Sequence, residues 1–456
     1  MSISKLQQYV QRILAWYARK ILAKYQPDVV AITGSVGKTS TKEAIFTVMS
    51  GAFAVRRSQG NLNNELGLPL AIIDAKSGGR NPFAWLGIFI KATKLLLQRR
   101  PFPEVLILEM GADHPGDISY LCSIARPRVS VVTAVAPVHT EFFGSVEKVA
   151  EEKSVLAKST EDDGYTILNA DDERVLEFHK LTKSRVLSYG IHAEADVQAT
   201  EVGFLYGKQE SFEAFPSIEG MRCVVHFEDK SATLELRGSV GQAIISSALA
   251  ATCVALAYGM DLRDIAEAFR HFVPPRGRTR LLKGQKRSLL IDDSYNASPR
   301  AVTAALQLIS DLSKDLRHHL TTGPLKKSET IESATFFRRI VVLGDMAELG
   351  EYTDDAHAEI GKTVKGHADI LVTVGKLGAK IAAAAREAGF PEEEVHEFPD
   401  AKAAVVFLRS VVGLHDIVLV KGSQSVRLER VVRELLQDPE EAEELLVRQG
   451  REWLRS

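Results

Sequence analysis

A short run that combines glycines, a lysine and hydroxyl side chains is the strongest candidate for chemistry in this sequence. It follows the apolar run Val29–Ile32, and its members are Gly34, Ser35, Val36, Gly37, Lys38, Thr39 and Ser40. Backbone N–H groups at a glycine turn and a helix N-terminus bind anions, an ammonium adds positive charge, and a threonine hydroxyl can bind Mg²⁺. The run therefore predicts a phosphate-binding loop between a strand and a helix. Ile32 replaces the first glycine of the longer G-x-x-x-x-G-K-[ST] motif, so an ordinary strand-to-helix turn is the alternative.

Candidate metal ligands follow two further predicted strands. Glu109 follows the apolar run Val105–Leu108, and His139 follows the run Val129–Val135. Ligands and Mg²⁺ commonly bind at the carboxyl ends of parallel strands, so both side chains are candidates for a metal site. A lone histidine is more often structural. The spacing of Lys153 in the next predicted helix indicates only a solvated surface lysine.

The amide-rich segment 60–69 is a third candidate for ligand binding. Its residues Asn63 and Asn64 precede an apolar helix. Asparagine side chains bind polar ligands, but they also form turns by bonding to the backbone two or three residues onward. Both roles are open for these two residues.

The composition describes an ordinary globular protein. The chain has 456 residues, 45% of them hydrophobic, with 57 Lys plus Arg against 59 Asp plus Glu. This length suggests two or three domains, and the balanced charge provides no general attraction to nucleic acid. Cys122, Cys223 and Cys253 lie among apolar neighbours, which indicates core thiols in a reducing compartment. Basic residues interrupt the apolar runs near the N-terminus, so we expect no signal peptide and a cytoplasmic location. Separately, we expect a monomer.

Two apolar segments have no evident part in the predicted phosphate site. Residues 3–25 have apolar side chains at helical spacing and several basic residues, and residues 82–98 are strongly apolar but include Lys91 and Lys94. These charges and the limited length argue against a membrane span. We expect the two segments to pack together as helices beside the phosphate-binding domain. The alternative is contact of their basic faces with anionic lipid or a partner protein.

The rest of the chain predicts an α/β fold with a second, Rossmann-like domain. The expected domains are residues 1–28 (an amphipathic helix), 29–273 (a central domain with a mainly parallel sheet) and 274–456 (a doubly wound domain). Segments 289–293, 340–343, 370–374 and 417–420 are its expected strands. Residues 313–336, including His318 and His319, predict a polar loop rather than a metal site. The Glu/Leu/Arg-rich C-terminus predicts a solvated helix.

Five blocks in this order resemble the Mur ligase family, whose members use ATP to join amino acids to the peptide of bacterial cell-wall precursors. The blocks are 33–41, 60–69, 109–115, 139–153 and 292–299, and the resemblance covers roughly 29–435. Segment 344–350 with Tyr352 and His357, together with 421–423, favours a member that adds D-Ala-D-Ala to a UDP-muramoyl-tripeptide. The resemblance thus implies an ATP-dependent amide ligase.

The resemblance also implies roles for individual residues. Lys38 and Thr39 would bind ATP phosphates and Mg²⁺, and Glu109 and His139 would ligate the metals, two Mg²⁺ ions, that bridge ATP and substrate. Lys153 would be carbamylated, which converts a cation into an anionic ligand of the second ion. Arg278, Asp292 and Asn296 would lie near the nucleotide. The candidate substrate-binding residues are Asn63, Asn64, Asp345, Glu348, Lys421 and Ser423.

Two departures from the family pattern keep other functions open. The family usually has a front domain that binds the UDP-sugar, whereas only 28 residues precede the phosphate-loop strand here, so we expect a loose grip on that end of the substrate. The helix at 241–251 also has Ala243, Ile244 and Ser247 in place of the family's amide and imidazole side chains. A ligase for a folate or poly-amino-acid substrate is one alternative. A nucleotide-binding partner subunit without catalysis is the other.

Overall fold

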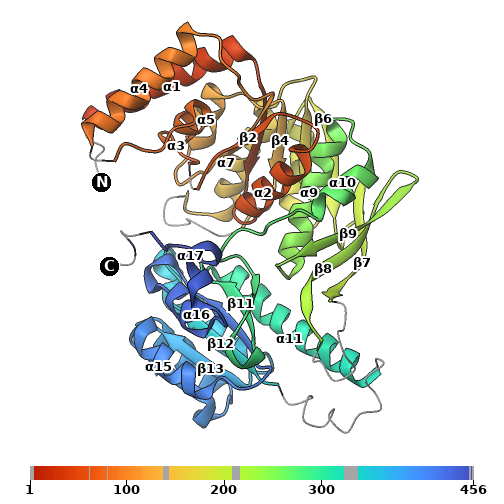
Figure 1. Cartoon of the computed structure of the whole chain (residues 1–456), viewed down its shortest axis with the longest axis vertical. Helices are drawn as coiled ribbons and strands as arrows, with labels where there is room; N and C mark the ends of the chain where they lie inside the picture. The colour runs from red at the N-terminus through yellow and green to blue at the C-terminus, as the bar shows by residue number, and fades with distance from the viewer. Residues whose placement is uncertain are drawn as a thin grey trace. The chain divides into compact units, whose positions relative to one another are not determined.

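The computed structural model describes residues 5–60, 62–79, 81–136, 143–207, 216–322, 337–450 and 453. Contacts divide the chain into two compact units (Figure 1). The first unit contains residues 1–201, 223–234 and 243–272, and the second contains 202–222, 235–242 and 273–456. The predicted boundaries at 28 and 273 remain a proposal.

Strand β1 (Asp28–Thr33) lies inside a sheet whose order is β2-β3-β1-β4-β5-β6-β7-β8-β9. It pairs in parallel with β3 (Val105–Glu109) on one side and with β4 (Val129–Val132) on the other, which confirms these three predicted strands. Their apolar, β-branched residues are buried. Because the carboxyl ends of β1, β3 and β4 are neighbours, the loops that follow them meet at one edge of the sheet. The remaining strands are β2 (Val55–Arg57), β5 (Tyr165–Asn169), β6 (Arg185–Gly190), β7 (Val197–Tyr206), β8 (Ile218–Phe227) and β9 (Lys230–Arg237).

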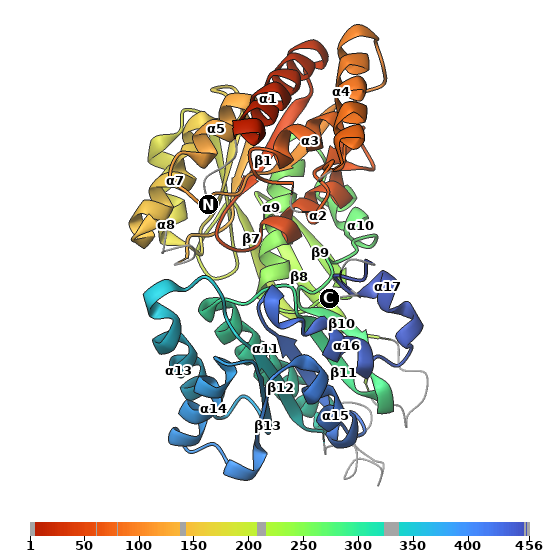
Figure 2. The ribbon, with the colours of Figure 1, turned by 90° about the vertical axis from the view of Figure 1, so that its left-hand side faces the viewer.

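Helices α1 and α4 confirm the predicted packing of the two apolar segments. The Tyr17 hydroxyl of α1 lies 2.8 Å from the Thr93 hydroxyl of α4, and the Lys24 ammonium donates to the Leu95 carbonyl at 2.8 Å. Both helices contact α3 (Figure 2), and their buried residues join one core with β1 and β3. The helices of the first unit are α1 (Lys5–Tyr25), α2 (Lys38–Met49), α3 (Gly67–Ile73), α4 (Pro82–Leu97), α5 (Asp117–Ile124), α7 (Val146–Ser159), α8 (Glu173–Leu176), α9 (Gln242–Ala257) and α10 (Leu262–Phe269).

The second unit contains the predicted Rossmann-like sheet. Its strand order is β10-β11-β15-β12-β13-β14, and every pair is parallel except the antiparallel pair β10–β11. The strands are β10 (Arg280–Lys283), β11 (Leu289–Asp293), β12 (Arg339–Gly344), β13 (Ile370–Val374), β14 (Val395–Phe398) and β15 (Ile417–Lys421). The helices are α11 (Pro299–Thr322), α13 (Thr353–Val364), α14 (Gly378–Glu387), α15 (Ala401–Val411), α16 (Glu429–Leu435) and α17 (Ala442–Leu445). This pattern confirms the doubly wound fold.

The predicted polar loop at 313–336 is wrong for its first part. Helix α11 continues to Thr322, and residues 323–336 lie outside the described part of the chain. Leu312, Leu316 and Leu320 are buried at intervals of four residues, so they extend the apolar face of the helix. The polar residues between them occupy the exposed side. His319 stacks on the ring of Tyr206, with ring centroids 4.1 Å apart.

The predicted solvated helix at the C-terminus is also wrong. The chain there forms the short helices α16 and α17, and Leu435 and Leu446 are buried in the core of the second unit. All three cysteines are buried and free, as predicted. Within the described ranges, none of the helices combines the length and apolar character needed to cross a membrane.

Candidate active site

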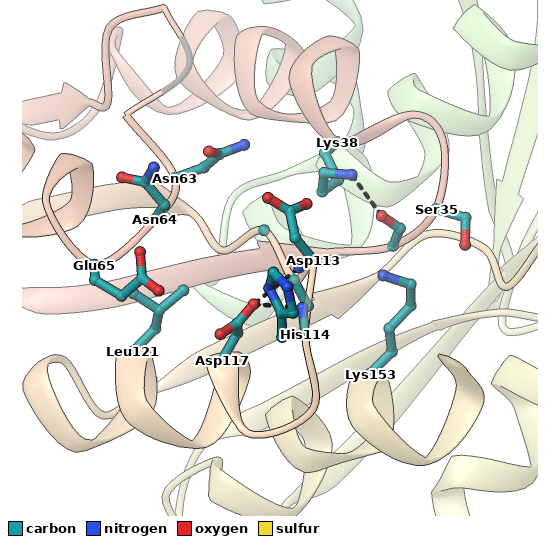
Figure 3. A pocket seen from close by; sticks show the side chains of 13 residues that line it. Ser35, Lys38, Asn63, Asn64, Glu65, Asp113, His114, Asp117, Leu121 and Lys153 are labelled. Carbon is teal, nitrogen blue, oxygen red and sulfur yellow. Dashed lines mark hydrogen bonds between the residues drawn. The ribbon is translucent and has the colours of Figure 1, made fainter. Parts of the chain in front are cut away.

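A cavity of about 280 Å³ lies where the loops after β1 and β3 meet the start of α5 and the middle of α7 (Figure 3). The predicted residues Gly34, Ser35, Lys38, Asn63, Asn64 and Lys153 line it. Other lining residues were not predicted: Glu65, Gly111, Ala112, Asp113, His114, Asp117 and Leu121. Polar side chains from four separate segments therefore converge on one cavity in the first unit.

The predicted phosphate-binding loop is held by hydrogen bonds to the segment that follows β4. The Ser35 N–H donates to the Ala134 carbonyl at 2.8 Å, and the Ala136 N–H donates to the Ser35 hydroxyl at 2.9 Å. Gly37 has φ 88° and precedes α2, whose first N–H groups face the loop. The Lys38 ammonium donates to the Gly34 carbonyl at 2.6 Å. A helix N-terminus and an ammonium therefore lie at one turn, as binding of an anion requires.

Gly34→Ala should disrupt this loop. Gly34 has φ 148°, and an added Cβ would lie 2.0 Å from the Thr133 hydroxyl oxygen and 3.0 Å from the Ala134 nitrogen. Because the second contact is backbone, the loop must shift, and we expect at least a tenfold loss of ATP affinity in equilibrium titration. Gly51→Ala is the control, since the Cβ that it adds would meet no atom within 4 Å. Equal affinities for the two variants would show that the loop does not bind the nucleotide.

Glu109 lies directly behind the cavity wall. Its buried carboxylate accepts from the Thr39 hydroxyl at 3.2 Å and from the lining residue Asn63 at 3.3 Å. The buried ammonium of Lys42 lies 3.5 Å from the same carboxylate. Lys42 was not predicted, although its position four residues after Lys38 places it on the adjoining turn of α2. Two hard oxygen donors, from Thr39 and Glu109, thus lie within contact distance of each other.

Lys153 is buried, so the surface position that its spacing indicated is wrong. It lies on the inner face of α7 with Val149 and Leu156, and Figure 3 shows its amine directed toward the phosphate-binding loop. Burial, with a smaller contribution from the charge of Lys38, lowers the pKa of Lys153 to about 7. Glu152 and Asp113 oppose this shift. A large fraction of the Lys153 amine is therefore neutral near pH 7.

Two carboxylate side chains hold the loop after β3 by accepting hydrogen bonds from its backbone N–H groups. The Asp117 carboxylate accepts from the N–H groups of Asp113 and His114 at 2.9 and 2.7 Å. The buried Glu152 carboxylate accepts from the Gly116 and Ile118 N–H groups at 2.8 and 2.7 Å. These bonds explain how a loop rich in polar residues keeps one shape at the cavity edge.

Asn64 makes the turn contact that was one of its two predicted roles. Its side-chain oxygen accepts from the Gly67 N–H at 2.9 Å at the start of α3. Binding of substrate by Asn64 remains a proposal.

The predicted residues of the second unit gather at the carboxyl ends of β11, β15 and β12. The buried Lys421 ammonium donates to the Asp293 carboxylate at 2.7 Å and to the Asn296 carbonyl at 3.0 Å. The Ser423 hydroxyl accepts from the Ala347 N–H at 2.8 Å. These bonds order the strand-end loops, while the ligand roles of these residues stay predictions.

Three other predicted residues of this unit have specific surroundings. The Asp345 carboxylate accepts from the Leu377 and Gly378 N–H groups, each at 2.9 Å. The Arg278 guanidinium lies 4.4 Å from the centroid of the Tyr295 ring. Glu348 has φ 64°, a conformation that places it in a tight turn after β12.

Asp292 should make stability depend on pH. It is fully buried, and its Oδ2 has no hydrogen-bond partner among the described residues. Burial raises the pKa of Asp292 from 3.8 to about 6. The folded state therefore favours the protonated form, and the resulting stability is complete below pH 3.8 and is lost as pH rises through 6.

A comparison with Asp292→Asn measures this effect. The free energy of unfolding of the native protein should fall relative to that of the variant by about 2 kcal/mol between about pH 4 and pH 8, measured by urea denaturation. The exposed Asp311→Asn on α11 is the control and should give a difference that does not vary with pH. A pH-independent difference for Asp292→Asn would contradict the raised pKa.

One predicted ligand cannot be placed. His139 lies outside the described residues. Within the described part, no three His, Cys, Asp or Glu side chains are arranged to hold a metal. The predicted metal set of Thr39, Glu109, His139 and Lys153 therefore stays a proposal.

Comparisons with known proteins identify the relatives of this chain. Residues 90–255 match the Mur ligase middle domain, and residues 326–424 match the Mur ligase glutamate ligase domain. The UDP-N-acetylmuramoyl-tripeptide–D-alanyl-D-alanine ligase of Mycobacterium bovis is 31% identical, with 90% of this chain and 73% of the relative covered. The enzyme of that name from Escherichia coli is 28% identical, with 93% and 79% covered.

Solved structures show the same fold. MurF ligase from Thermotoga maritima, solved in complex with ADP, superposes with a TM-score of 0.71 at 24% identity, covering 95% of this chain and 84% of that one. MurF from Acinetobacter baumannii gives 0.71 at 24% identity, covering 94% and 81%. The two domain matches and the similarity along most of the chain lead to one conclusion. The chain belongs to the Mur ligase family.

Proposed function

We propose that this protein is an ATP-dependent ligase that forms an amide bond between a UDP-muramoyl-tripeptide and D-Ala-D-Ala. The convergence of Lys38, Lys153 and Asn63 on one cavity, with Glu109 directly behind it, is the observation that most supports this function. The curated relatives named above support the choice of substrates. They favour this activity over a folate or poly-amino-acid ligase. The presence of Lys38, Glu109, His139 and Lys153 together argues against a subunit without catalysis.

The reaction takes place in two chemical steps. A carboxylate oxygen of the tripeptide attacks the γ-phosphorus of ATP, and ADP leaves, so an acyl phosphate forms. The D-Ala-D-Ala amine then attacks the acyl carbon, loses a proton, and inorganic phosphate departs with the carboxylate oxygen. The loop N–H groups and Lys38 hold the phosphates and neutralise the charge that develops at the transferred group.

The residues behind the loop fit Mg²⁺. The Thr39 hydroxyl and the Glu109 carboxylate are hard oxygen donors 3.2 Å apart, the kind of donor that Mg²⁺ prefers. When bound, Mg²⁺ would neutralise phosphate charge during phosphoryl transfer. Asn63 and Lys42 hold the Glu109 carboxylate in place through its two oxygens.

Lys153 is proposed to react with CO₂ to form a carbamate. The nitrogen lone pair forms a bond to the carbon of CO₂, and the electrons of one C=O π bond move to its oxygen. The nitrogen then loses a proton to water, which leaves a carbamate with one negative charge. Only the neutral amine has that lone pair, and burial of Lys153 favours the neutral form. The product would supply an anionic oxygen ligand at the cavity wall.

An assay with each substrate omitted in turn tests the proposed function. Phosphate release from ATP should require both the UDP-muramoyl-tripeptide and D-Ala-D-Ala, because the acyl phosphate is consumed only by the amine. Replacing D-Ala-D-Ala with glutamate should abolish release. Equal release without either substrate, or with glutamate, would reject this function.

A further inference from the structure

The outward face of helices α1 and α4 is unusually apolar for a protein surface. Tyr9, Ile13 and Trp16 of α1 are 62%, 45% and 50% exposed. On α4, Phe83 and Leu97 are both 81% exposed. Leu86 and Ile90 of α4 are exposed between them. We call this set of seven side chains the α1–α4 face.

The two halves of this face lie side by side. Helices α1 and α4 contact each other along Tyr17, Phe89 and Thr93, and each contacts α3 (Figure 1). Buried residues such as Leu14 on α1 and Ala92 on α4 point into the core. The exposed residues recur at helical intervals of three, four or seven, opposite those buried residues, so both stripes face outward. Packing of the two helices therefore leaves one two-helix apolar surface uncovered.

The same two helices have charge of only one sign. Residues 5–25 include five Lys or Arg and residues 82–100 include four, and neither segment contains Asp or Glu. The whole chain has a formal net charge of −2, so this concentration of positive charge is local. Lys20 and Lys94 are exposed beside the apolar stripes. The aromatic rings and cations together match the composition of helices that lie in a lipid interface.

We propose that the α1–α4 face binds the surface of an anionic lipid bilayer. The apolar stripes would enter the boundary between headgroups and acyl chains, while the flanking lysines and arginines contact anionic headgroups. A second copy of the chain is a poorer occupant, because the positive charges of these helices would be brought against an identical set. This inference is independent of the proposed ligase activity, since no residue of the α1–α4 face lines the cavity.

Vesicle flotation of the full chain tests this proposal. Vesicles of phosphatidylcholine with one third phosphatidylglycerol should bind the protein at low salt, and binding should weaken in high salt. Vesicles of phosphatidylcholine alone should bind at least tenfold less. Equal binding to both vesicle types, or no binding to either, would overturn the proposal.

Variants separate the charges from the apolar stripe. Lys20→Glu with Lys94→Glu should weaken binding to the anionic vesicles at least tenfold, since each cation near the membrane contributes to the attraction. Lys376→Glu with Lys402→Glu, at exposed positions of the second unit, is the matched control and should bind as the native protein does. Ile90→Ser should also weaken binding, whereas Val406→Ser, 73% exposed on α15, should not. Equal effects of the face variants and their controls would overturn the proposal.

Two further measurements give signals that a folding defect would not imitate. With Trp85 and Trp453 replaced by Phe, Trp16 fluorescence should shift to shorter wavelength when anionic vesicles are added, and further replacement of Trp16 by Phe should remove this signal while flotation persists. Sedimentation velocity without lipid should show that the native protein and Ile90→Ser have the same oligomeric state, so the α1–α4 face does not mediate self-association. Such self-association, together with absence of vesicle binding, would assign the face to a second copy instead.

Discussion

Replacing Lys38 by alanine is expected to lower kcat by about 10²- to 10³-fold, because a preorganised cation at the transferred phosphoryl group is lost. The Lys38 ammonium already lies within the loop, 2.6 Å from the Gly34 carbonyl, so the native protein needs no large movement to place it. The rate of phosphate release with both substrates at saturating concentration measures the effect.

The exposed Lys76→Ala is the control for Lys38→Ala, because it removes the same charge elsewhere in the first unit. It should retain native turnover. Lys38→Arg keeps the charge but changes its shape, and we expect it to recover only part of the rate. Near-native turnover of Lys38→Ala would show that another group supplies the positive charge.

Lys153→Ala should reduce turnover by a comparable factor, since it removes the proposed carbamate at the cavity wall. Removal of CO₂ from the buffer should lower the activity of the native enzyme, and bicarbonate should restore it. Because only the neutral amine reacts with CO₂ and burial lowers the pKa of Lys153 to about 7, the recovery should be faster at pH 8 than at pH 6 when the concentration of dissolved CO₂ is the same at both pH values.

Lys158→Ala on the same helix is the matched control for Lys153→Ala, because Lys158 is exposed. It should respond to bicarbonate as the native enzyme does. Mass spectrometry of the intact protein at high bicarbonate should detect the added mass of one CO₂ on the native chain, which Lys153→Ala should lack. An active Lys153→Ala variant with no dependence on bicarbonate would contradict the carbamate.

Local pattern was sufficient for the strands that position the predicted site and for the centre of the second sheet. The apolar runs that became β1, β3, β4, β11, β12, β13 and β15 are short, β-branched and followed by polar strand ends, so their type and order could be predicted. The first part of 313–336 was misassigned because its many polar residues obscured the interval of four between Leu312, Leu316 and Leu320. The apolar periodicity, rather than the mean polarity, determined that helix.

The site was harder to predict because it depends on contacts between distant segments. Lys153 looked like a surface charge, yet it lies at the intervals of Val149 and Leu156, and that pattern places it on the inner face of α7. The pairing of Lys42 with Glu109 joins residues far apart in the sequence, and no local pattern reports it. Glu65 and Asp113 likewise reach the cavity only through the packing of separate loops. For Lys153, the resemblance to the Mur ligase family predicted a place in the site, which its local sequence pattern did not indicate.

The proposed acyl phosphate can be tested most directly with a UDP-muramoyl-tripeptide whose reacting carboxylate contains ¹⁸O in both oxygens. Because one carboxylate oxygen bonds to the γ-phosphorus and leaves with it, the released inorganic phosphate should contain one ¹⁸O atom in each turnover. The amide product should retain the other. Inorganic phosphate without ¹⁸O, formed while the amide product accumulates, would contradict the mechanism.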